Sequence, residues 1–223
     1  MKLEFLQLIS PSLPVGAFSY SEGLEWLVQN KKVNNETTLF NWIESELSRG
    51  QITIEASSIS HIMKDLVNWK NNSDAQHKFV IEEWNSWLSS LRDSPEVRSQ
   101  QIQMGESLLQ LFIDLGHPLP DNEKKFIWPI AWAWAGVSWD IPKIDLVEGF
   151  LYSWVANQLS AGIRLMPLGP TEAQQIQCSL LYLIETEAKK LLTKNPHQLW
   201  TGDVGATIAQ SSHSELYSRL FRS

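Results

Sequence analysis

The chain has 223 residues, of which 43% are hydrophobic and 19% charged, and this composition excludes an intrinsically disordered protein. The formal net charge of −7 at pH 7 argues against nucleic-acid binding, because phosphate contacts need clustered lysines and arginines. The single cysteine, Cys178, excludes a disulfide framework and a cysteine-rich zinc site, and its apolar neighbours predict a small buried side chain.

The N-terminal apolar run, residues 3–9, contains Glu4 and Gln7 and makes a poor signal peptide. The longest uncharged runs, residues 126–139 and 150–163, are shorter than the ~20 residues that a membrane-spanning helix needs. We therefore expect a cytoplasmic protein.

The apolar run ends at a stiff segment, residues 10–25, which we call the first elbow. Pro14 fixes its own φ and removes a backbone donor, and Gly16 allows a positive φ or a close approach by another group. Ser19 and Glu22 have the spacing of a capping box, so we predict that Ser19 is the N-cap of a new helix and Glu22 its third residue.

The middle of the chain is predicted to be helical, because apolar residues recur three or four positions apart and helix-breaking residues separate the runs. These predicted helices cover residues 39–50, 52–66, 79–91 and 96–115. A tryptophan-rich helix follows from Asp121 to Trp139, in which Pro129 either introduces a kink or delays the start. Residues 142–163 are apolar nearly all round, as in the central helix of a bundle.

The central helix must end at a second rigid segment, residues 164–170, the second elbow. Thr171 to Gln174 again has capping-box spacing and opens a helix that continues to Leu191. No run alternates with period two for long. The sequence therefore predicts an all-α, single-domain helical bundle of about eight to ten helices over residues 1–199, with a partly flexible tail over residues 200–223.

The tail ends in an aromatic and basic segment, for which two interpretations remain open. Either it forms a helix that docks on its own domain, or it orders on a partner. In the second case Tyr217 and Phe221, spaced i, i+4, are apolar anchors and Arg219 is the charged contact.

The sequence shows no catalytic constellation. Its five histidines are never spaced i, i+4, and it contains neither a G-x-x-x-x-G-K-[ST] loop nor a G-x-S-x-G turn. A nickel or zinc site assembled from distant residues stays open. Arg164, between an apolar helix and the second elbow, either locks that elbow or faces a partner.

Three motifs in order resemble the UreF family of urease accessory proteins. The first is Ser-Pro-Ser-Leu-Pro-Val-Gly-Ala-Phe-Ser at residues 10–19, and the second is Arg-Leu-Met-Pro-Leu-Gly at residues 164–169. The third is His213 followed by Tyr-Ser-Arg-Leu-Phe-Arg-Ser at residues 217–223. Pro170 and Ser214 depart from the family's usual Gln and Glu.

The resemblance implies a helical, homodimeric adaptor with no catalytic activity and no cofactor of its own. Such proteins bind UreD (also called UreH), recruit the GTPase UreG and help to deliver nickel to apo-urease, and the assembled complex handles the metal. The residues implied to contact UreD are His213, Tyr217, Arg219, Leu220 and Phe221. Those implied to shape the dimer or the GTPase-facing surface are Pro14, Gly16, Ser19, Glu22, Glu25, Arg164, Pro167 and Gly169.

Two other functions remain as alternatives. A helical enzyme could assemble a site from dispersed residues such as Arg164 and Glu25. A membrane-surface protein could use the tryptophan-rich residues 128–139, although the negative net charge weighs against this.

Overall fold

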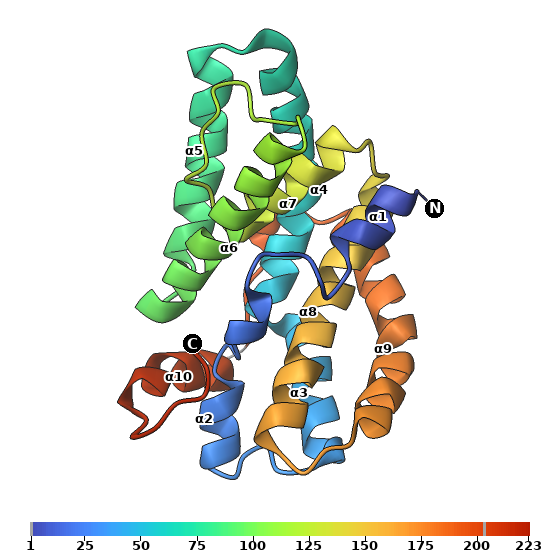
Figure 1. The fold of residues 1–223 in the computed structure, drawn as a ribbon, viewed down its shortest axis with the longest axis vertical. Helices are drawn as coiled ribbons and strands as arrows, with labels where there is room; N and C mark the ends of the chain where they lie inside the picture. The colour runs from blue at the N-terminus through green and yellow to red at the C-terminus, as the bar shows by residue number, and fades with distance from the viewer. Residues whose placement is uncertain (1, 203) are drawn as a thin grey trace.

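Ten α-helices and three 3-10 helices make up the computed structural model, which describes residues 2–202 and 204–223 and holds no strand within them (Figure 1). The all-α prediction of eight to ten helices is thus confirmed. The elements are α1 (Leu3–Leu8), η1 (Ala17–Ser19), α2 (Leu24–Gln29), α3 (Glu36–Arg49), α4 (Gln51–Asn72), α5 (Ala75–Ser90), α6 (Pro95–Asp114), α7 (Trp128–Ser138), α8 (Lys143–Leu165), α9 (Pro170–Leu191), η2 (Pro196–Gln198), α10 (Val204–Ser212) and η3 (His213–Glu215).

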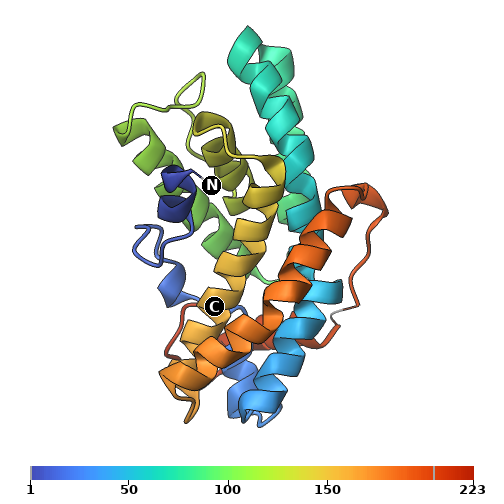
Figure 2. The same ribbon diagram turned by 90° about the vertical axis from the view of Figure 1, so that its right-hand side faces the viewer.

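The centre of the bundle is formed by α4 and α8. Helix α8 packs against α9, α4, α2, α3 and α7, and α4 packs against α7, α5 and α3. Figure 1 shows α5 and α6 to one side of α8, and Figure 2 shows α9 running alongside it. The prediction that residues 142–163 form the central helix is confirmed, because a helix with neighbours all round buries apolar residues all round.

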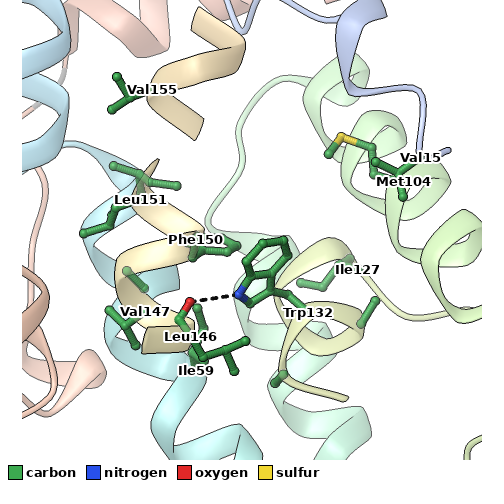
Figure 3. Close-up of a cluster of buried hydrophobic side chains, with 14 of the residues drawn as sticks. Val15, Ile59, Met104, Ile127, Trp132, Leu146, Val147, Phe150, Leu151 and Val155 are labelled. Carbon is green, nitrogen blue, oxygen red and sulfur yellow. Dashed lines mark hydrogen bonds between the residues drawn. The ribbon is translucent and has the colours of Figure 1, made fainter. Parts of the chain in front are cut away.

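The tryptophan-rich helix α7 lies in the core. The indole of Trp132 is 1% exposed and its Nε1 donates to the main-chain oxygen of Leu146 at 3.0 Å (Figure 3). Trp134 is also buried. The two central tryptophans of this stretch therefore face the core, while Trp128 and Trp139 at its ends are half-buried. None of the helices in the described ranges is long and apolar enough to cross a membrane.

Helix α7 begins at Trp128, so the predicted start at Asp121 is wrong and the delay at Pro129 is confirmed. Proline suits a first helical turn because the donor that it lacks would have no partner there. The preceding segment is held by α5, where Asn85 Oδ1 accepts a hydrogen bond from the Ile127 N–H at 2.9 Å.

The capping box predicted at Ser19 and Glu22 is wrong. Ser19 ends the 3-10 helix η1, and α2 begins later, at Leu24, with Gly23 as its N-cap at φ +90°. Glu22 has φ +50° and directs its carboxylate to other helices. The Glu22 side chain, which its spacing from Ser19 assigned to a helix cap, therefore makes tertiary contacts instead.

The second capping box was predicted to begin at Thr171, which is two residues too late in the chain. Helix α9 begins at Pro170 with Gly169 as its N-cap, and Glu172 Oε2 accepts from the Gly169 N–H at 2.7 Å. Cys178 is exposed rather than buried, because it lies about 200° around the helix from Ile176 and Leu180, which face the core.

Candidate functional site

The C-terminal tail folds back onto the first elbow. After α10 and η3 the chain is irregular, with bends, from Leu216 to Ser223, so the helical spacing predicted for Tyr217 and Phe221 is wrong. Helix α10 packs against α2 and α6. Gly23 makes this approach possible, because a Cβ there would lie 2.9 Å from the main-chain nitrogen of Gln210. We call the contacts of residues 213–223 with residues 18–29, α6 and α8 the tail clasp.

Glu25 is the central acceptor of the tail clasp. It lies in the first turn of α2 and is 2% exposed. Its Oε1 accepts from the Leu220 N–H at 2.6 Å, and its Oε2 accepts from the Phe221 N–H at 3.0 Å. A buried carboxylate needs such donors to offset its loss of water. This side chain therefore fixes the path of the tail backbone.

The fully buried imidazole of His213 joins two carboxylates. Its Nε2 lies 3.0 Å from Glu25 Oε2 and its Nδ1 lies 3.1 Å from Glu96 Oε2. Both contacts are hydrogen bonds when both ring nitrogens carry a proton. Arg219 Nη1 also donates to Glu96, at 2.5 Å. Two basic side chains of the tail thus meet two acidic side chains, one from α2 and one from α6.

The last two residues pair with the backbone of the elbow. The Ser21 N–H donates to the main-chain oxygen of Ser223 at 2.7 Å, and the Arg222 N–H donates to that of Ser19 at 2.9 Å. Ser223 Oγ donates to Gln100 Oε1 at 2.5 Å. The pairing explains why Ser21 and Ser223 are buried although both are polar.

Glu22 continues this network into the bundle. Its Oε1 accepts from Gln100 Nε2 at 2.8 Å and its Oε2 accepts from Trp154 Nε1 at 3.2 Å. The elbow is therefore tied to α6 and α8 through one carboxylate, and the left-handed backbone at Glu22 aims that carboxylate inward.

Arg164 links the two elbows through the clasp. Its Nη1 donates to the main-chain oxygen of Phe18 at 2.7 Å, and its guanidinium lies 4.3 Å from the centre of the Phe221 ring. Arg164 thus locks the first elbow and the tail, rather than the second elbow in which it stands. Phe221 is 4% exposed, so its ring packs within the chain.

The structure brings together most of the predicted site residues. Seven of them take part in the tail clasp: Ser19, Glu25, Arg164, His213, Arg219, Leu220 and Phe221. Glu22 ties the elbow to α6 and α8 beside it. Pro14 and Pro167 are exposed in the elbows, Gly16 takes φ +74° before η1, and Gly169 caps α9. The sequence prediction did not include Glu96 and Gln100. The only local indication of a shared role was that they stand four residues, about one helical turn, apart on α6.

The tail clasp also presents apolar side chains to solvent. Tyr217 is fully exposed and Leu220 is 55% exposed, while Phe18 is 68% exposed on the elbow. Helix α10 adds the exposed side chains of Val204 and Ile208. Exposed apolar side chains on a rigid support are typical of a protein–protein interface.

Glu25 and Arg164, the residues named for an enzyme site, are both engaged with main-chain groups of the tail or the elbow. Within the described ranges, no group of three or more His, Cys, Asp or Glu side chains could hold a metal ion.

The sequence profile of the urease accessory protein UreF matches residues 33–181, which is more than half of the chain. The chain belongs to the UreF family. A urease accessory protein UreF of Prochlorococcus marinus is 41% identical over 219 residues, covering 96% of this chain and 95% of its own. Those of a Synechocystis species and of Microcystis aeruginosa are each 36% identical, over 232 and 220 residues, covering 100% and 98% of this chain and 98% and 96% of their own. Since the family profile ends before the tail, the pairwise likeness extends the UreF assignment beyond residues 33–181.

Proposed function

We propose that this chain is a non-catalytic adaptor of urease maturation in the cytoplasm. It binds UreD through the tail clasp, and the pair recruits the GTPase UreG to apo-urease for nickel insertion. The chain acts as a homodimer and hands the nickel on as cargo of the assembled complex. Membership of the UreF family supports the maturation role.

One observation carries the proposed contact with UreD. Tyr217 and Leu220 are exposed, yet the backbone between and beside them is fixed by Glu25, and by Gln29 Nε2, which donates to the Ser218 main-chain oxygen at 3.1 Å. A preorganised segment loses little conformational entropy when it binds, so its apolar side chains contribute more of their contact energy to affinity.

Replacement of both exposed side chains, Tyr217→Ala with Leu220→Ala, tests the contact. Tyr217 is fully exposed and Leu220 is more exposed than buried, so thermal melting should change little. Affinity for purified UreD, measured by biolayer interferometry, should fall by about 2–4 kcal/mol, the range for interface anchors. Removal of the whole tail is a less specific test, because it would also delete His213 and leave the buried carboxylate of Glu25 without its donors.

Tyr182→Ala on α9 is the matched control, since Tyr182 is 80% exposed and lies outside the tail clasp. It should leave UreD affinity unchanged. Equal affinity of the double variant and the unaltered chain would refute the assignment of Tyr217 and Leu220.

A further inference from the structure

A second surface, on α5, has features of a binding site that the tail clasp does not use. A hollow of about 910 Å³ lies between α5, α4 and η2, and we call it the α5 groove. Phe79, Trp84 and Trp87 of α5 line it together with His197 of η2 and Asp65 of α4. Phe79 is 57% exposed, so the groove offers a large aromatic surface to solvent.

Three aromatic rings form the wall of the groove. The imidazole of His197 stacks on Trp84, with ring centres 5.2 Å apart and planes 22° apart, and lies 4.1 Å from the ring of Trp87. Trp84 is oriented by its Nε1, which donates to Asp65 Oδ2 at 2.8 Å. The indoles thus already pack against one flat, nitrogen-bearing ring of the same chain.

The charged side chains that line the α5 groove are all acidic. Asp65, Glu82 and Glu83 face the groove, and no lysine or arginine is among the described residues that line it. Lys78 lies 3.8 Å from Glu82 and 2.6 Å from Asp121, so its charge is shared with a carboxylate outside the groove. Glu83 is exposed. Carboxylates beside half-buried indoles and the exposed ring of Phe79 favour a cationic ligand.

We propose that the α5 groove binds an arginine-bearing segment of a partner protein, with the guanidinium on the indoles and against Glu83. Arginine fits better than lysine, because its planar group stacks on aromatic rings and bonds a carboxylate through two N–H groups. An apolar neighbour of the arginine packs on Phe79. A second copy of this chain fits poorly, since a symmetric contact would bring the two sets of groove carboxylates together.

Peptide titration of the full chain, labelled with 15N at its tryptophan indoles, tests this proposal. The probes are blocked seven-residue peptides with one central arginine flanked by leucines, and the same peptides with lysine or citrulline at that place. Spectra of Trp84→Phe and Trp87→Phe assign the two indole N–H signals. The arginine peptide should shift both signals saturably, with at least about threefold higher affinity than the lysine peptide and tenfold higher than the citrulline peptide.

Glu83→Gln should weaken binding of the arginine peptide by about fivefold or more, because an exposed charge is removed without altering the fold. The matched control is Glu185→Gln on α9, another exposed glutamate, which should change nothing. Equal affinities for the three peptides, unmoved indole signals, or an unchanged affinity of Glu83→Gln would overturn the proposal. So would indole shifts that grow with protein concentration alone, since a second copy would then occupy the groove.

Discussion

Glu25 shows how one side chain can set the position of a distant segment. The carboxylate is almost completely buried, and its nearest donors come from residues 195 and 196 positions later in the chain. Its place in the first turn of α2 adds the favourable field of the helix N-terminus. Loss of this side chain would leave two main-chain N–H groups and Nε2 of His213 without an acceptor.

We expect Glu25→Ala to release the tail. The free energy of unfolding should fall by roughly 3 kcal/mol, because buried donors lose their partner. Hydrogen exchange of residues 216–223, followed by mass spectrometry, should become faster, while α8 and α9 keep their protection. Glu36→Ala is the control: Glu36 also lies in a first helical turn, that of α3, but is exposed. Equal exchange rates in the two variants would argue against the role assigned to Glu25.

At the scale of elements, Gly105 explains how α6 meets the segment before α7. A Cβ at this position would collide with the main-chain oxygen of Phe126 and lie 2.7 Å from the carbonyl carbon of Ile127. These are backbone atoms, which cannot move aside as the end of a flexible side chain can. The structure thus supplies the steric reason for a glycine at this position.

Gly105→Ala should therefore push α6 away from α7 and lower the free energy of unfolding by about 2–4 kcal/mol in urea denaturation. Gly205→Ala provides the comparison, since that glycine lies in α10 and a Cβ added there would meet no atom within 4 Å. It should be neutral or stabilise the chain slightly, by the higher helix propensity of alanine. Similar destabilisation by both changes would show that close packing at Gly105 is unimportant.

At the scale of the whole molecule, a buried ion pair joins α4 to the turn after α5. Glu55 Oε1 accepts from Arg92 Nε at 2.8 Å and from Nη2 at 2.6 Å, and both side chains are at most 4% exposed. Burial raises the pKa of Glu55 above its ordinary value of 4.5; the Arg92 charge opposes this, and the nearby Glu22 charge adds to it. The two glutamates line a cavity of about 60 Å³ between α4, α6 and α8.

The raised pKa of Glu55 predicts a pH dependence of stability. Above pH 4.5 the unfolded chain loses this proton before the folded chain does, so the folded state binds more protons and its advantage shrinks as pH rises. Glu55→Gln has no such proton. The difference in unfolding free energy, unaltered chain minus variant, should therefore fall from pH 4.5 upward and level off above the folded pKa.

Urea denaturation of both chains between pH 4.5 and 8 would measure this difference. A rise of the difference with pH would mean that pairing with Arg92 outweighs the burial of Glu55, and would contradict the prediction.

The sequence by itself determined the helices, because an apolar stripe needs only residues a few positions apart. The predicted runs at 39–50, 52–66 and 142–163 correspond to α3, α4 and α8. The errors fell at helix starts, as at Ser19 and Asp121. At a helix start, local capping and tertiary contacts compete for the same side chain. The carboxylate of Glu22, for example, accepts hydrogen bonds from Gln100 and Trp154 instead of capping a helix.

Only the tertiary structure decided how the tail is held. The family resemblance singled out His213, Arg219 and Phe221, but it could not say that Glu25 and Glu96 receive them. Partners more than 100 positions apart leave no periodic trace in the sequence, since their meeting depends on how α2, α6 and α8 pack. The fold's local elements are thus set by short-range patterning, whereas the tail clasp exists because packing brings opposite charges and unpaired backbone groups together in a place with little water.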